Sequence, residues 1–316
     1  METKNYDILE LNISKSKLDS LPSDISRYTN LHTLVCNKNN LTNLDNLPSG
    51  LIELNCNNNQ LTNLDNLPSG LKILKCNYNQ ITVLDNLPSG LIELDCSNNK
   101  ITSLDYLPSN LEILDCSYNE ISKLDNLPSG LVRLILIKNN VSNLDNLPPN
   151  LKELNCILNK LTQLDYLPPE LKVLNCSRNW IKSLDNLPPS LEILHCWDTN
   201  ISNLDNLPHG LIELVSVRTK LTSLDNLPST LKILDCGTNK LTTLDNLPSG
   251  LLELNCSHNQ IIHLDNIPLS IEILWHVGNN FTYDFDVSLT SLKKYILEKR
   301  KLDNPDKLDN LDKINN

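Results

Sequence analysis

The 316-residue sequence contains no alanine, only eight glycines and few aromatic residues, which make up 4% of the chain. The missing alanine, with abundant Asn, Lys and Ile, indicates AT-rich coding rather than selection for a chemistry. The few glycines form no phosphate-binding loop, since most of them end a repeat. No apolar run approaches the ~20 residues that cross a bilayer, and the first residues lack the apolar core of a signal peptide. We therefore expect no membrane contact and no secretory route.

A basic patch is also missing. The formal net charge is −11, from 27 Lys and Arg against 38 Asp and Glu. Twelve of the acidic residues occupy one repeat position, every 20 residues from Asp45 to Asp265, and without them the chain would be nearly neutral. Because clustered Lys and Arg supply the affinity for phosphate backbones, we expect no nucleic-acid partner.

The chain is built mainly from one 20-residue sequence motif, which is repeated from Leu31 to Asn280. Its frame is Leu-x-x-Leu-x-Cys-x-x-Asn-x-Leu-x-x-Leu-Asp-Asn-Leu-Pro-x-x. We count positions from the opening leucine, so that Leu51 and Leu71 are both position 1. Such a fixed period is the signature of a solenoid, and a solenoid grows along one axis as a single unit. Residues 8–30 fit the frame as a first repeat of 23 residues, so the sequence predicts 14 stacked strands.

Each half of the repeat has its own predicted structure. Alternation around Leu54-Asn55-Cys56 predicts a short strand that stacks into a parallel sheet, with positions 3, 5 and 7 facing outward. The Asn at position 9, for example Asn59, can bond the turning backbone through its amide. Pro48 and its equivalents favour an extended return half, because proline pushes the preceding residue toward extended or polyproline II geometry.

All ten cysteines lie at position 6. Stacked strands would place neighbouring thiols about 4.8 Å apart with parallel Cβ vectors, which does not suit a disulfide. We therefore expect ten buried free thiols, which are typical of a reducing compartment such as the cytoplasm. A row of thiols is also not a four-ligand cluster, so no metal centre is expected there.

The row of aspartates at position 15 has two interpretations. We favour a turn in which each carboxylate bonds its own backbone. The alternative is calcium bound between adjacent repeats, since repeated carboxylates repel one another unless they share a cation. We expect no cofactor.

The ends differ from the repeats. Residues 1–7 precede the solenoid, which spans 8–280. Residues 281–302 are expected to form a cap with a helix, for which Ser288 is the predicted N-cap and Lys301 the approximate end. The polar segment 303–316 is expected to be disordered.

The repeat resembles that of leucine-rich-repeat proteins over about 270 residues. Its length, with Leu-Pro in the return half, is similar to the bacterial type III effectors of the YopM and IpaH-like group, and to leucine-rich-repeat proteins of giant DNA viruses of amoebae. The resemblance implies a curved horseshoe of α/β type, mostly β, with a parallel sheet on the concave face where proteins bind.

The chain also departs from those effectors. It has Leu-Asp-Asn-Leu-Pro where they usually have Leu-Pro-x-Leu-Pro, and it lacks their N-terminal helical hairpin and any ligase domain. The Cys-x-Asp tripeptide of the ligase members is matched by Cys196-Trp197-Asp198, but Cys196 occupies the core position 6. We therefore expect no enzyme activity, since a motif outside its structural context is weak evidence.

Specificity must come from outward residues that differ between repeats. Glu53 and Ile73 begin an alternation at position 3, which either separates like charges or reflects duplication of a two-repeat unit. The frame deviates most between Leu131 and Lys220, where aromatic, apolar and Arg residues, the types favoured at interfaces, replace polar ones. The candidate partner-binding residues are Arg133, Ile135, Ile137, Ile157, Arg178, Trp180, His195, Trp197, Val215, Val217 and Arg218.

The sequence thus favours a non-catalytic, monomeric scaffold that binds an unknown protein partner through its sheet. It would be a viral or effector-type protein that meets a host protein, in the host cytoplasm if it is viral. Two alternatives remain open: a fragment of an effector-type ubiquitin ligase without its catalytic domain, and a self-associating structural protein.

Overall fold

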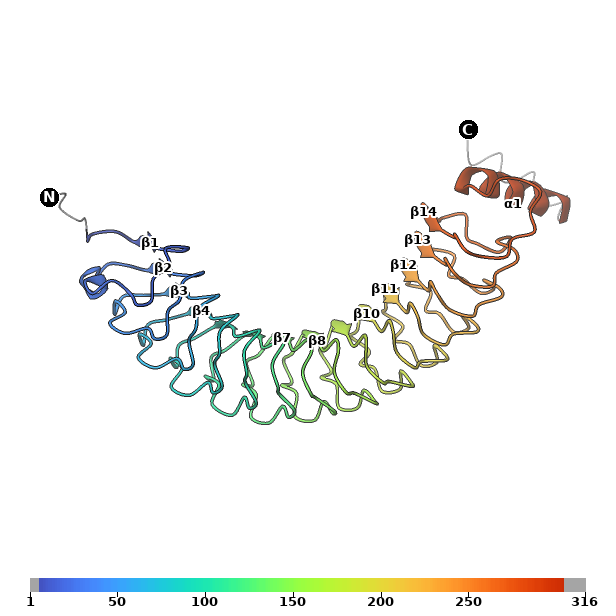
Figure 1. Cartoon of the computed structure of the whole chain (residues 1–316). Coiled ribbons are helices and arrows are strands. Elements are labelled where there is room, and N and C mark those ends of the chain that lie inside the picture. The colour runs from blue at the N-terminus through green and yellow to red at the C-terminus, as the bar shows by residue number, and fades with distance from the viewer. Residues whose placement is uncertain (1–5, 304–316) are drawn as a thin grey trace, which may run out of the picture. The chain divides into compact units, whose positions relative to one another are not determined.

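The computed structural model describes residues 6–303 and divides the chain into two compact units (Figure 1). The first unit comprises residues 1–181 and 186–191, and the second comprises 182–185 and 192–316. The first unit holds nine strands and a 3-10 helix: β1 (Glu10–Asn12), η1 (Ile25–Arg27), β2 (Thr33–Val35), β3 (Glu53–Asn55), β4 (Ile73–Lys75), β5 (Glu93–Asp95), β6 (Ile113–Asp115), β7 (Arg133–Ile135), β8 (Glu153–Asn155) and β9 (Val173–Asn175). The second holds β10 (Ile193–His195), β11 (Glu213–Val215), β12 (Ile233–Asp235), β13 (Glu253–Asn255), β14 (Ile273–Trp275) and α1 (Leu289–Asp303).

Strands within each unit pair in parallel and at equivalent repeat positions. Leu54 of β3 lies opposite Leu74 of β4, and Leu194 of β10 lies opposite Leu214 of β11. Because side chains alternate along a strand, position 4 points into the core while positions 3 and 5 point outward. All 14 predicted strands are present in the described chain, which confirms the parallel stacking.

The core is built from the same five positions in each 20-residue repeat. In one repeat Leu51, Leu54, Cys56 and Leu61 are fully buried, and Leu64 is 2% exposed. All ten cysteines are buried free thiols, as the sequence predicts. Burial disfavours the charged thiolate, and so raises the pKa of Cys36 to about 12 and the pKa of Cys56 well above its usual value.

The return half consists of turns, and the described residues between 31 and 280 contain no helix. The Asn at position 16 adopts a left-handed conformation in most repeats, for example at Asn46 (φ 63°) and Asn126 (φ 59°). Asn tolerates this region better than most residues. The non-helical return half predicted from the proline pattern is therefore confirmed for the described residues.

The aspartates of position 15 are held differently from our expectation. Asn126 Nδ2 donates to Asp105 Oδ1 of the preceding repeat at 3.2 Å, and Asn226 bonds Asp205 in the same way at 3.2 Å. The backbone N–H of Asp105 is bonded at 3.2 Å by the hydroxyl of Ser103, at position 13. The prediction that each carboxylate bonds its own backbone is therefore wrong for these aspartates, because the neighbouring repeat offers an amide donor. Calcium binding between repeats, the less favoured alternative, stays an open hypothesis.

The Asn of position 9 forms a ladder that joins successive repeats. Asn79 Nδ2 donates to the carbonyl of Cys76 at 2.9 Å and to that of Cys56, in the preceding repeat, at 3.2 Å. Its Oδ1 accepts the backbone N–H of Leu61 at 3.0 Å. One buried amide thus satisfies three backbone groups that the turn would leave unpaired, which confirms the predicted role of this Asn.

The ladder changes in the second unit, where Thr199 and Thr219 replace Asn. The hydroxyl of Thr219 donates within its own repeat to the carbonyl of Ser216 at 3.1 Å, and lies 2.8 Å from Asn239 Oδ1. A threonine hydroxyl has one proton and is shorter than an amide, so it cannot make all three bonds of an Asn. In the described chain no side-chain bond from Thr219 reaches the N–H of the buried Ile201. The joint between these two repeats therefore has fewer hydrogen bonds.

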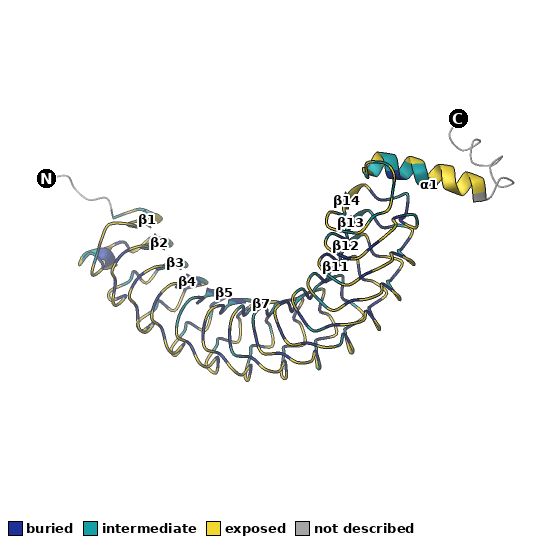
Figure 2. Cartoon of the chain, turned by 45° about the vertical axis from the view of Figure 1, so that its right-hand side comes forward, coloured by how far each residue is buried: buried dark blue, intermediate teal, exposed yellow. Residues whose placement is uncertain are grey.

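A cap follows the last strand. Ser288 is the N-cap of α1, since its hydroxyl accepts the N–H of Ser291 at 3.1 Å, as predicted. Leu292 and Ile296 are buried, and Figure 2 shows that the second half of the helix is exposed. Tyr295 packs its ring 5.5 Å from that of Tyr283. α1 ends at Asp303, and the rest of the predicted tail lies outside the described residues.

Asp265 fastens this cap to the last repeats. Its carboxylate accepts the hydroxyl of Tyr283 at 2.5 Å and the ammonium of Lys299 at 2.6 Å. Burial alone would raise the pKa of Asp265, but these two bonds outweigh it and hold the pKa below its usual value. The helix is therefore fixed at one end by apolar packing and at its side by this charged contact.

Candidate protein-binding face

The outward face of the sheet is polar in a regular repeat. Glu53, Asn55 and Asn57 occupy positions 3, 5 and 7, and Asn55 Oδ1 accepts the N–H of Asn57 at 3.2 Å. The residue at position 8 follows in a left-handed turn in the described repeats, for example Asn58 at φ 55°. The face is thus covered by short side chains that bond their own turn.

The second unit carries an apolar group on this face, at the predicted positions. His195 lies in register with Val215, and Trp197 and Val217 occupy position 7 of the same two repeats. All four are half-buried. We call Trp197, Val215 and Val217 the β10–β11 cluster. His195 Nε2 lies 2.8 Å from Glu213 Oε1, which places a polar pair at its side.

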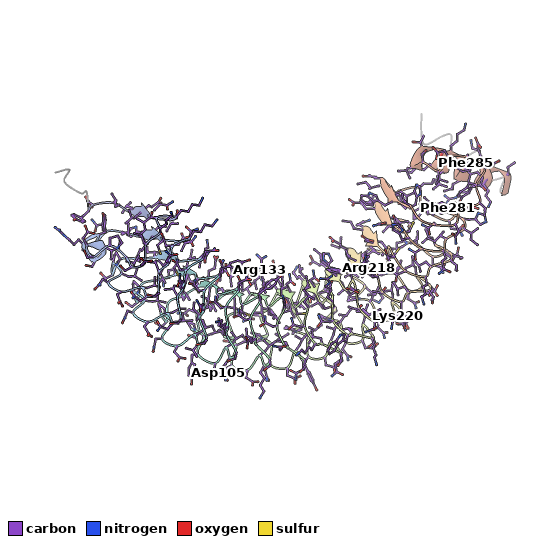
Figure 3. All side chains as sticks on the ribbon, in the orientation of Figure 1. Asp105, Arg133, Arg218, Lys220, Phe281 and Phe285 are labelled. Atoms are coloured by element: carbon purple, nitrogen blue, oxygen red, sulfur yellow. The ribbon has the colours of Figure 1, made fainter. Side chains whose placement is uncertain are left out.

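Arg218 lies at the edge of this cluster. It follows Val217 in the left-handed turn with φ 53° and is exposed (Figure 3). A left-handed arginine is uncommon, but here the turn geometry of position 8 imposes it, as in the other repeats. The second unit thus places an apolar centre beside a positive charge.

The first unit carries a separate part of the predicted set. Ile135, Ile137 and Ile157 are half-buried on the face of β7 and β8. Arg133 is exposed and its Nε lies 3.1 Å from Glu153 Oε2, in the next strand. Figure 3 shows Arg133 on the strand side of this unit, with Asp105 on the opposite side.

Two predicted residues of the first unit lie away from the strands. Arg178 is an exposed residue of the left-handed turn after β9, with φ 54°. Trp180 follows the ladder residue Asn179, and 57% of it is exposed. Neither occupies an outward strand position.

A third apolar group was missed by the sequence reasoning. Ile273, Trp275 and Val277 occupy positions 3, 5 and 7 around β14 and are 41%, 50% and 68% exposed. We call them the β14 cluster. Their signal was present, since Trp and Val break the polar consensus at positions 5 and 7, but the interval chosen for the interface ended at Lys220.

Two acidic residues lie on neighbouring strands of this face in the first unit. In the first unit Asp95 lies in register with Asp115 on the neighbouring strand. Burial raises the pKa of Asp115, and the charge of Asp95 adds to the effect. Asp95 Oδ2 accepts the amide of Asn77 and so has a partner within the sheet.

The chemistry of the site does not resemble that of a catalytic centre. Cys196 is fully buried, so its thiol does not face the surface on which Trp197 lies. Among the described residues, no group of three or more His, Cys, Asp and Glu has the arrangement of a metal site. The described chain also has no helix of the length and apolarity that a bilayer requires.

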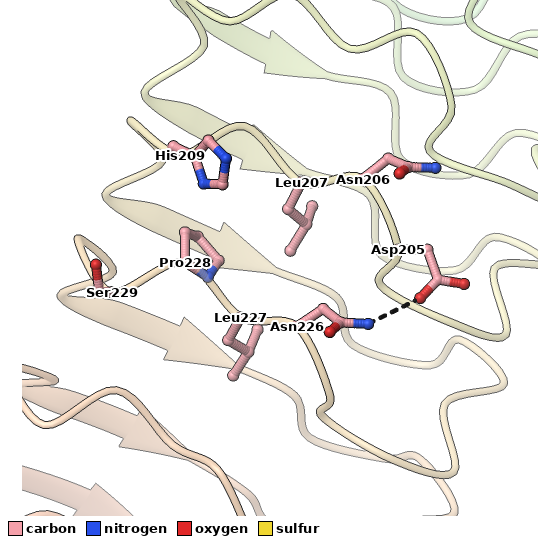
Figure 4. A pocket seen from close by; sticks show the side chains of 8 residues that line it. All are labelled: Asp205, Asn206, Leu207, His209, Asn226, Leu227, Pro228 and Ser229. Atoms are coloured by element: carbon pink, nitrogen blue, oxygen red, sulfur yellow. Dashed lines mark hydrogen bonds between the residues drawn. The ribbon is translucent and has the colours of Figure 1, made fainter.

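One hollow of the second unit lies on the return side rather than on the sheet. It has a volume of about 820 Å³ and is lined by residues of two adjacent repeats, among them Asp205, His209 and Asn226 (Figure 4). The carboxylate of Asp205 is bonded by Asn226, so His209 has no activated acidic partner there. Apart from His209, the hollow is lined by residue types that recur at the same positions of the other repeats.

These features define a class: a parallel-stranded solenoid with a leucine core, a cysteine row and an asparagine ladder. The family model for leucine-rich repeats (two copies) matches residues 89–129. No curated protein sequence matches the chain. Several solved structures, in contrast, are similar to the chain.

YopM of Yersinia pestis, described as a leucine-rich effector protein, shares 33% identity over 86% of this chain and 78% of its own, with a TM-score of 0.77. YopM of Yersinia enterocolitica WA-314 shares 31% identity over 87% and 79%, with a TM-score of 0.57. The functional domain of InlJ from Listeria monocytogenes, described as including a cysteine ladder, shares 28% over 90% and 66%, with a TM-score of 0.70. The chain belongs to the leucine-rich-repeat family, whose members generally serve as binding scaffolds.

Proposed function

We propose that the chain is a non-catalytic scaffold that binds a protein partner through the sheet face of its second unit. The observation that carries this proposal is the β10–β11 cluster, in which Trp197, Val215 and Val217 stand where regular repeats carry Asn, Ser or Asp. An aromatic anchor beside apolar neighbours, with Arg218 at its rim, is the arrangement of an interface hot spot.

The cellular setting belongs to the same proposal. The likeness to YopM, described as an effector protein, supports an effector-type role in which the partner is a host protein. The buried thiols support a reducing compartment. Burial of Cys196 argues against a catalytic role for this thiol, and we propose a monomer. The candidates of the first unit, Arg133 to Trp180, stay predictions that need their own variants.

The test is quantitative affinity capture from lysate with wild-type chain and with Trp197→Ala/Val217→Asp as baits. We expect partner proteins to be lost from the variant at least tenfold. Asn37→Ala/Asn57→Asp is the matched control, since it makes the same changes at position 7 of two adjacent repeats away from the cluster, and it should capture normally. Ile137→Asp tests the first unit separately.

Stability must be measured alongside. Because Trp197 is only half-buried, we expect the double variant to melt within a few degrees of wild type. Normal capture by a folded double variant would place the binding site elsewhere. Global unfolding would show that Trp197 is structural, and the single variant Val217→Asp would then decide whether the cluster binds.

A further inference from the structure

We propose that the sheet face of the second unit binds a positively charged peptide segment, which carries apolar side chains on both sides of its charged residues. This inference rests on the proposed function and adds the chemistry of the partner. It follows from two features of strands β10–β14: two apolar clusters, and acidic residues on the strands between them.

The apolar groups lie at the two ends of this face. The β10–β11 cluster lies on the first two strands of the unit and the β14 cluster on its last strand. Trp275 and Val277 are 50% and 68% exposed, more than an apolar side chain in the interior of the sheet. Contiguous exposed apolar surface of this kind usually marks an interaction site.

The strands between them are acidic on the outward face. Positions 3 and 5 of β11 to β13 carry Glu213, Asp235 and Glu253 and no Lys or Arg. Glu213 is paired with His195, which is charged only when it is protonated. The centre of the face therefore favours a cation, and the desolvated position of carboxylates between apolar groups strengthens that preference.

Gly237 is a buried residue beside Asp235 in this centre. It occupies position 7, where its neighbours carry Val217 and Ser257. A Cβ built on Gly237 would lie 3.3 Å from Asp235 Oδ1 and 3.4 Å from the carbonyl of Ser257, so a side chain there would crowd the carboxylate. Asp235 accepts the N–H of Gly237 at 3.0 Å and Nδ2 of Asn255 at 3.1 Å, so its carboxylate is held in place on the half-buried face.

The spacing sets the size of the segment. Three to four strand separations of about 4.8 Å place the two clusters roughly 14–19 Å apart. This distance corresponds to about 10–13 residues of helix at 1.5 Å per residue, or to about 4–6 residues of extended chain. A 16-residue peptide is therefore long enough to contact both clusters.

The experiment is selection of random 16-residue peptides displayed on phage against the immobilised full chain, followed by binding measurements with the selected peptides. We expect them to carry net positive charge with apolar residues on both sides. Asp235→Asn should weaken them about tenfold at low salt, and Trp275→Ala should weaken them at least fivefold. Asp205→Asn, which removes a carboxylate of the same unit away from the sheet, is the matched control and should leave binding unchanged.

The outcomes separate this inference from the proposed function. Peptides that bind wild type and Trp197→Ala/Val217→Asp equally well would contradict the proposed function. Peptides that need the β10–β11 cluster but are neutral or acidic, or are insensitive to Asp235→Asn, would overturn the inference and leave the proposed function standing. Gly237→Arg gives a second check, since a cation placed beside Asp235 should reduce the binding of a cationic peptide.

Discussion

Thr219→Asn should stabilise the protein by completing the asparagine ladder. In a regular repeat the Asn amide donates to the preceding repeat and its oxygen accepts a buried N–H, as Asn79 does. At the joint after Cys196 the variant would supply both bonds, to the Cys196 carbonyl and from the Ile201 N–H. It would lose the contact of the Thr219 hydroxyl with Asn239 Oδ1, which is 2.8 Å long in the wild type.

The magnitude follows from this exchange. The variant gains two hydrogen bonds and loses one, at about 0.5–1.5 kcal/mol each, and it also gives the buried Ile201 N–H a partner. The free energy of unfolding should therefore rise by about 1–2 kcal/mol. At about 2–4 °C per kcal/mol for a chain of this size, the melting temperature should rise by roughly 2–8 °C.

Thermal melting measures the gain in stability, and amide hydrogen exchange measures the protection of the Ile201 N–H. Exchange at Ile201 should slow about tenfold in Thr219→Asn, since a tenfold change corresponds to about 1.4 kcal/mol. The mirror variant Asn79→Thr should destabilise by about 2 kcal/mol or more. An unchanged melting temperature in both variants would refute the reasoning, because the ladder would then contribute nothing to the joints between repeats.

Three further predictions concern other positions. Gly130→Ser should stabilise the protein by about 0.5–1.5 kcal/mol in thermal melts. The added Cβ would make only van der Waals contact, 3.6 Å from the Ser109 carbonyl, and the hydroxyl of Ser190, at the same repeat position, donates to two carbonyls. A lower melting temperature would contradict this prediction. Thiol reagents at pH 8 should not react with the native chain and should titrate ten thiols after denaturation, since burial raises the thiol pKa values; rapid labelling of the native state would count against this burial. The folded protein holds the pKa of Asp265 below its ordinary value of about 3.9, so the ionised carboxylate stabilises the fold at pH values above about 3.9, and this stability is lost as the pH falls through the folded pKa. Asp265→Asn should remove this contribution. A stability difference between wild type and variant that is equal at pH 3 and pH 7 would exclude it.

The period of the sequence predicted most of the fold because each position has one environment in all repeats. The buried row of Cys56 and its equivalents, the parallel strands and the ladder role of Asn59 all follow from alternation and from the need to pair buried backbone groups. The N-cap at Ser288 was predictable for a similar reason, since a helix start has a local chemical signature.

The parts that sequence could not predict depend on contacts between repeats. Asp105 bonds Asn126 of the next repeat, and no pattern within one repeat reveals that partner. The left-handed turn at position 8, occupied by residues as different as Tyr78 and Arg178, also has no residue signature. The binding residues were predicted only in part, because the exposure of Trp275 depends on its being in the last strand, which nothing covers as fully as the strands before it.

The uniform core has a consequence for how such a gene can change. Because Leu51, Leu71 and Leu91 meet the same neighbours, removal or duplication of any 20 residues in the regular part of the first unit would join two surfaces that already fit. Recombination between near-identical coding segments would therefore yield folded chains of different length, whereas a shift by any other number of residues would misalign the core. The ends behave differently, since α1 covers one particular last repeat. Length should thus vary among close relatives in steps of whole repeats, inside the array and not at its caps.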